Sequence, residues 1–182
     1  MTRMRAWILA SVVLIGVAVG AAIHAHGFSQ RARVSPHETV SGSVDGATIT
    51  IVYGRPSMRG RTIFGTLVPF DRVWCPGADE ATTVESSLPL RVGNVQVPAG
   101  PHTIWMLPTR EAWTLIISKQ RSGFHTYYPP DQDLGRVTLR KRELDTPVEQ
   151  LTFAVTAAAE GGGELAMRWE RTEVTVPLSV TK

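Results

Sequence analysis

The sequence of 182 residues has little cysteine, lysine or net charge. Cys75 is its one cysteine, which excludes an intramolecular disulfide. A lone thiol in an oxidising compartment is either buried and inert or reactive, and we expect Cys75 to be buried. The net charge of +3 falls to about +1 without the N-terminal Arg3 and Arg5. The remaining chain has no basic field for a polyanion, so we expect no nucleic-acid binding.

Charged residues are absent from residues 7–23, an apolar run that follows Arg3 and Arg5. This pattern is typical of a secretory signal peptide or a membrane anchor. We therefore predict that residues 1–25 are a signal peptide, cleaved after Ala25, or an uncleaved anchor in the inner membrane with a cytoplasmic N-terminus. Residues 26–36 would form a linker. Residues 37–182 would be an exported domain, periplasmic, secreted or anchored outside the cytoplasmic membrane.

An amphipathic helix of useful length is also absent, and the hydrophobic period after residue 36 is two. Ile49, Ile51 and Tyr53 alternate with their neighbours, and the same alternation recurs in residues 113–118, 151–156, 165–170 and 173–180. Such stripes predict strands with one face in a core. Asp45-Gly46 and Gly93-Asn94 are hairpin turn signals. The sequence therefore predicts an all-β fold, a single antiparallel β-sandwich or barrel-like domain.

Three further segments resemble the signature of the bacterial domain of unknown function 2911 family. They are residues 53–65 (YGRPSMRGRTIFG), residues 73–82 (VWCPGADEAT) and residues 168–172 (RWERT). The resemblance covers nearly all of the chain after the linker. It implies export in bacteria and a compact β-rich domain, and it supplies no activity. The family pattern has other polar residues at Cys75 and Asp79, so the resemblance carries no charge-assisted contact there.

Residues 54–69 and 120–135 interrupt the alternation and predict long loops, which are common places for function. Arg55, Arg59 and Arg61 could hold a phosphate, sulfate or carboxylate by their guanidinium forks. The alternative that we favour is that they tie the loop to backbone carbonyls and to nearby acids (Asp71, Asp79 and Glu80).

Catalytic and metal-binding patterns are incomplete. Asp79 and Glu80 are adjacent, so on an extended segment their side chains point to opposite faces and form a poor catalytic pair. Glu80 alone, with the loop arginines, is a candidate acid or base for an envelope hydrolase. Cys75, His102 and His125 are a candidate copper or zinc set, although no pair has ligand spacing. The sequence requires no cofactor.

Aromatic residues offer a last group of candidates. Trp113 and Trp169 are in phase with the aliphatic stripes and are predicted in the core, whereas Trp105 and Tyr127 are candidate ligand contacts together with His125. The hypothesis that we favour is a non-catalytic envelope domain. Through one end of a sandwich it would bind a small anionic or glycan ligand or an envelope protein. The hydrolase and the metal protein remain the alternatives.

Overall fold

A computed structural model of the chain describes residues 35–181, so the predicted signal peptide or anchor lies outside the described residues. Within 35–181 no helix is long and apolar enough to cross a membrane. The regular elements are nine strands and one 3-10 turn, η1 (Pro130–Gln132). The strands are β1 (His37–Val44), β2 (Ala47–Gly54), β3 (Thr83–Ser86), β4 (Leu90–Val92), β5 (Val95–Val97), β6 (Gly100–Pro108), β7 (Trp113–Ser118), β8 (Asp133–Ala157) and β9 (Gly163–Val180).

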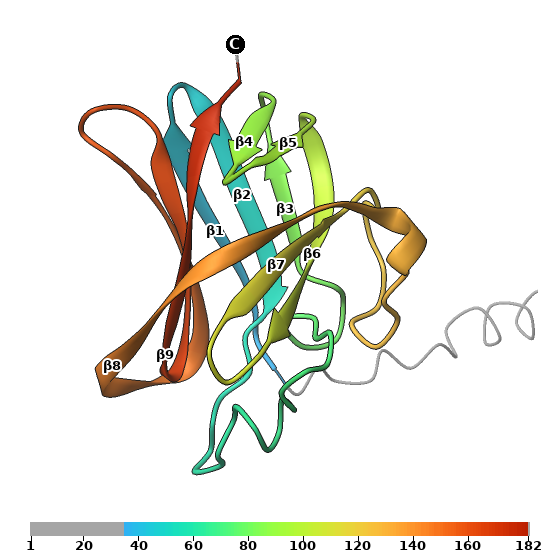
Figure 1. Cartoon of the computed structure of the whole chain (residues 1–182), viewed down its shortest axis with the longest axis vertical. Coiled ribbons are helices and arrows are strands. Elements are labelled where there is room, and N and C mark those ends of the chain that lie inside the picture. The colour runs from blue at the N-terminus through green and yellow to red at the C-terminus, as the bar shows by residue number, and fades with distance from the viewer. Residues whose placement is uncertain (1–34, 182) are drawn as a thin grey trace, which may run out of the picture. The chain divides into compact units, whose positions relative to one another are not determined.

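All strand pairs are antiparallel and form one sheet in the order β1-β2-β3-β6-β7-β8-β9-β4-β5. The sheet is not closed, because β1 and β5 remain its edges. The long strand β8 crosses the front of the domain obliquely (Figure 1), and β1 packs against it. The first part of β8 pairs with β7 and the rest pairs with β9. The all-β prediction is confirmed, as a sandwich whose two layers share β8.

The two layers lie in close contact. A Cβ atom on Gly42 of β1 would lie 2.8 Å from the Cβ of Val155 in β8, so only glycine fits there. Between the layers the alternating residues of β2, Ile49, Ile51 and Tyr53, are all buried. Trp113 and Trp169 are buried as predicted. The period-two pattern therefore identifies the residues of the main core.

Both predicted hairpin turns are present. Asp45 and Gly46 join β1 to β2 with φ values of 50° and 82°, and this left-handed backbone matches the twist of paired strands. Gly93 joins β4 to β5 with a φ of 56°. These two dipeptides therefore predict the ends of β1, β2, β4 and β5 to within one or two residues.

The outer face of β6 and β7 carries a second, smaller core. Trp105 and Ile116 pack there with Cys75 and Ala81, and Tyr128 covers them. Cys75 is buried, as expected. The ring of Trp105, a candidate ligand contact, is also buried and lies beneath the surface rather than on it. The reason is that a loop covers this face of β6, which sequence alternation cannot reveal.

Candidate functional site

Arg55, the first arginine of the 55–82 loop, bonds to the domain itself. Arg55 donates to the Leu151 carbonyl from Nε (3.2 Å), to Glu38 from Nη1 (3.3 Å) and to the Thr152 hydroxyl from Nη2 (3.1 Å). These bonds join β1, the end of β2 and β8. The favoured interpretation of Arg55 as a structural tie therefore agrees with the structure, but its acid is Glu38 rather than Asp71, Asp79 or Glu80.

Arg61 and Arg59 have different surroundings. Arg61 donates to the carbonyls of Met58 (2.9 Å) and Ser57 (2.7 Å), both within its own loop. Arg59 has a left-handed backbone with a φ of 51°, and its amide donates to Glu149 Oε1 at 2.8 Å. Its exposed side chain has no hydrogen-bond or ionic partner among residues 35–181. The three guanidinium groups thus do not form an anion site.

Glu170 is a structural residue that the sequence did not single out by its spacing. Its two carboxylate oxygens accept the amide hydrogens of Ile63 and Phe64, each at 3.2 Å. Glu170 has a φ of 54° in an irregular part of the β8–β9 ladder. The loop is thereby fixed so that the Phe64 ring meets the Trp113 ring edge-on at 4.7 Å. The only sequence signal for this role is the position of Glu170 within the RWERT motif.

The loop that carries Asp79 and Glu80 lies directly on the end of β2. A Cβ atom on Gly54 would lie 2.1 Å from the Ala78 carbonyl oxygen, so the loop can approach only glycine. His37 is the residue of β1 that pairs with Gly54. As a result His37 Nε2 lies 2.7 Å from Glu80 Oε2, an electrostatic contact whose geometry is not that of an aligned hydrogen bond.

The loop between β7 and β8 lies against the same segment. Glu80 and Phe124 form an antiparallel bridge, and the Ala81 amide donates to the Gly123 carbonyl at 2.9 Å. The Asp79 carbonyl oxygen accepts two hydrogen bonds from His125, one from its backbone amide (3.2 Å) and one from its ring Nδ1 (2.5 Å). Two loops far apart in sequence therefore form one surface.

Two aromatic side chains are exposed on this surface. Phe124 is 55% exposed and Tyr127 is 69% exposed. A turn connects them, since the Tyr127 amide donates to the Phe124 carbonyl at 3.1 Å. We call the group of His37, Glu80, Phe124, His125 and Tyr127 the Glu80 surface. It contains the candidate ligand contacts His125 and Tyr127 but none of the loop arginines.

Tyr128 anchors the loop between β7 and β8 to the domain. Its hydroxyl donates to both oxygens of Asp133 (2.7 and 2.8 Å), and Arg136 donates to the same hydroxyl at 2.8 Å. Burial and the hydrogen bond to the Asp133 carboxylate raise the pKa of Tyr128 to about 12. The Tyr128 ring also packs against Trp105. The exposed rings of Phe124 and Tyr127 therefore stand on an anchored loop.

The three proposed metal ligands are not gathered. No group of three His, Cys, Asp or Glu side chains within 35–181 is arranged to hold a metal ion. The ring nitrogens of His102 lie 3.0 Å from the carbonyl oxygens of Ser118 and Pro98, and His125 bonds to Asp79. Burial raises the pKa of the Cys75 thiol to about 11. The structure therefore gives no support to the copper or zinc hypothesis.

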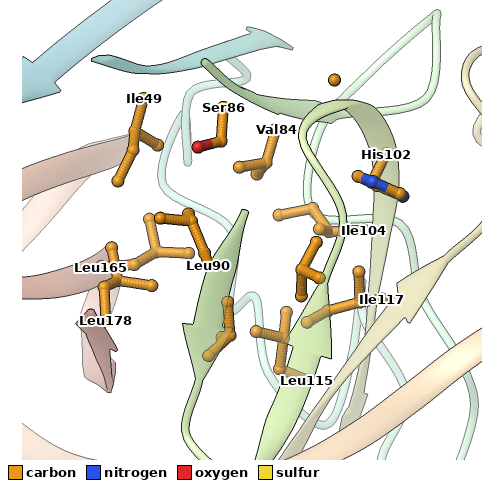
Figure 2. A pocket seen from close by; sticks show the side chains of 13 residues that line it. Ile49, Val84, Ser86, Leu90, His102, Ile104, Leu115, Ile117, Leu165 and Leu178 are labelled. Atoms are coloured by element: carbon orange, nitrogen blue, oxygen red, sulfur yellow. The ribbon is translucent and has the colours of Figure 1, made fainter. Parts of the chain in front are cut away.

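A cavity lies between the layers beneath the β4–β5 hairpin. Aliphatic side chains line it, among them Ile49, Leu90, Ile104 and Leu115 (Figure 2). Its volume is about 20 Å³, far below the several hundred Å³ that a small-molecule pocket needs. It has room for about one water molecule, and a cavity so apolar stays dry. This cavity is a packing defect rather than a ligand site.

Comparison with known proteins identifies a family but no activity. The model of a family described as "Protein of unknown function (DUF2911)" matches residues 35–178. No curated protein and no solved structure matches the chain.

Proposed function

The chain belongs to the DUF2911 family of proteins of unknown function, and from that premise we propose that it is an exported, non-catalytic domain that binds a neutral glycan at the Glu80 surface. The observation that carries this proposal is the exposure of two aromatic rings three residues apart, Phe124 and Tyr127, on an anchored loop. Large exposed rings are costly in water, and they gain most when an apolar face covers them.

A sugar ring presents such a face. Its axial C–H bonds stack on an aromatic ring, and its hydroxyl groups need hydrogen-bond partners at the edge. Glu80, whose side chain is 48% exposed, forms a backbone bridge with Phe124, and its carboxylate can accept hydrogen bonds. Because Tyr128, Asp133 and Arg136 anchor the loop, its backbone loses little conformational entropy on binding. Rigid aromatic faces beside a polar acceptor favour a sugar over a charged metabolite.

The hydrolase hypothesis has no comparable support. It needs at least two of the loop arginines beside Glu80, to hold an anion while Glu80 transfers a proton. Arg55 and Arg61 instead donate their hydrogen bonds to Glu38, Thr152 and backbone carbonyls. The Glu80 surface is better suited to binding than to acid–base chemistry.

Binding of the full chain to a panel of neutral hexose and N-acetylhexosamine oligosaccharides tests the proposal. We expect Phe124→Ala and Tyr127→Ala each to weaken binding about tenfold, as loss of a central aromatic contact does. Leu67→Ala is the matched control, because Leu67 is also an exposed apolar residue but is not part of the Glu80 surface. Thermal unfolding verifies that all variants are folded. Absence of binding to every oligosaccharide, or equal losses in the control, would refute the proposal.

A further inference from the structure

A second polar site lies on β8 and β9, on the face opposite the core. Val137 and Leu139 of β8 are buried in the core, so the alternating residues Arg140 and Arg142 project outward. In the β8–β9 ladder Arg140 pairs with Thr175, and Arg142 pairs with Glu173. The outer face of this ladder therefore begins with two neighbouring guanidinium groups.

The hairpin curves so that its distant end adds to this site. The β8–β9 register shifts between Glu143 and Val148 and again before Thr152. Beyond these irregularities Arg168 donates from Nε to Glu173 Oε2, and Arg140 Nη2 lies 3.9 Å from Glu164 Oε2. The result is a groove of about 420 Å³, lined by Arg140, Lys141, Arg142, Glu164, Glu173 and Thr175.

Glu173, which lines the groove, holds two arginine side chains in position. Its side chain is only 7% exposed. Arg142 donates to Oε1 from Nε (3.0 Å) and Nη2 (2.5 Å), while Arg168 occupies Oε2. Burial alone would raise the pKa of Glu173, but the hydrogen bonds from Arg168 and Arg142 outweigh it and lower the pKa. The single ionised carboxylate of Glu173 thus orients two guanidinium groups, but its charge balances the positive charge of only one of them.

The groove therefore keeps a positive charge. Arg140, Lys141 and Arg142 line the groove with the carboxylates of Glu164 and Glu173, and Arg168 pairs with Glu173, so these six groups carry a net charge of +2. The Lys141 ammonium bonds to the Arg110 carbonyl at 2.7 Å. Nη1 of Arg142 and Nε and Nη1 of Arg140 have no hydrogen-bond partner in residues 35–181. Such donors, held in planar forks, match the oxygens of phosphate and sulfate.

We propose that this groove binds a tetrahedral oxyanion, phosphate or sulfate, either free or as an ester on a small molecule. Arg140 and Arg142 are the ligands, and Glu173 with Arg168 positions Arg142. A volume of about 420 Å³ admits a phosphorylated or sulfated monosaccharide as well as the free ion. This site uses none of the residues of the Glu80 surface, so the two proposals stand or fall separately.

Calorimetric titration of the full chain in a neutral detergent with inorganic phosphate, sodium sulfate and glucose 6-phosphate tests the site. We expect dissociation constants of about 1 mM or tighter at low salt. Arg140→Gln and Arg142→Gln should each weaken binding about tenfold or more, because each removes charge-assisted hydrogen bonds. Arg72→Gln, which removes the same charge from an exposed arginine in the 55–82 loop, should bind as the unmodified chain does. Tighter binding of glucose 6-phosphate than of phosphate identifies an ester as the better ligand.

Glu173→Gln separates a built site from a diffuse positive patch. The substitution adds positive charge to the groove, so a patch that acts only by charge would bind phosphate more tightly. A site that depends on the orientation of Arg142 would bind it more weakly, which is the expected result. No binding of any of the three ligands would overturn the proposal. Equal weakening by Arg72→Gln, or tighter binding by Glu173→Gln, would overturn it as well.

Discussion

The hydroxyl group of Tyr128 anchors the loop between β7 and β8, which carries Phe124 and Tyr127. Its folded pKa of about 12 lies above the value of about 10 for a free tyrosine, so folding favours the protonated form. The stabilisation is complete below about pH 10 and is lost as pH rises through about 12. Tyr128→Phe should therefore be less stable than the unmodified chain, and this difference should shrink at alkaline pH. Urea unfolding across this range measures it.

The control for this prediction is Tyr127→Phe, because Tyr127 is exposed and its hydroxyl has no hydrogen-bond partner within residues 35–181. It should keep the alkaline profile of the unmodified chain. If Tyr128→Phe kept that profile too, the Tyr128–Asp133 bond would contribute nothing to folding.

Glu170 uses both carboxylate oxygens on backbone amides, those of Ile63 and Phe64. Glu170→Gln keeps the size of the side chain but turns an N–H group toward one of the two amides. We expect a loss of about 1–3 kcal/mol in the free energy of unfolding, the typical cost of leaving a buried donor unsatisfied. Urea unfolding followed by tryptophan fluorescence measures it. Glu160→Gln, at an exposed turn, should change stability by less than about 0.5 kcal/mol.

At the scale of elements, the sequence predicts what local chemistry decides. The alternation around Ile49 and the turns at Asp45-Gly46 and Gly93-Asn94 correspond to strands and hairpins of the structure. The alternation does not reveal that β6 is covered on both faces, so it does not show that the Trp105 ring is buried. The Leu151 carbonyl that Arg55 bonds and the amides that Glu170 bonds lie about 100 residues away in sequence. No local pattern encodes such a distance, so most of the site had to come from the structure.

The two hairpin glycines offer a matched test of element packing. Gly46 and Gly93 both have positive φ, but a Cβ on Gly46 would meet nothing within 4 Å. A Cβ on Gly93 would lie 2.4 Å from Val137 Cγ1 in β8. Gly46→Ala should cost about 1 kcal/mol from backbone strain alone. Gly93→Ala should cost about 1–3 kcal/mol more, from overpacking. Equal losses in urea unfolding would mean that the β4–β5 hairpin does not pack firmly on β8.

At the scale of the whole molecule, β8 and β9 connect the two layers. They also make many of the hydrogen bonds between residues that are far apart in sequence. They hold the 55–82 loop through Glu149, Leu151 and Glu170, and they form the arginine groove on their outer face. The Glu80 surface in turn depends on the loops before β3 and before β8. The whole described domain should therefore behave as one cooperative unit rather than as a rigid sheet with loose loops.

Cys75 reports on that cooperativity. Its thiol lies in the 55–82 loop, is buried against Trp105 and Ile116 and has a pKa of about 11, so native protein should react very slowly with a thiol reagent such as dithionitrobenzoate at neutral pH. If the loop opens only with the whole domain, the labelling rate should rise with urea as steeply as global unfolding does. Tryptophan fluorescence in the same urea series supplies the comparison. Rapid labelling that does not depend on urea would mean that residues 73–82 open by themselves, and the Glu80 surface would then lack the fixed geometry that binding requires.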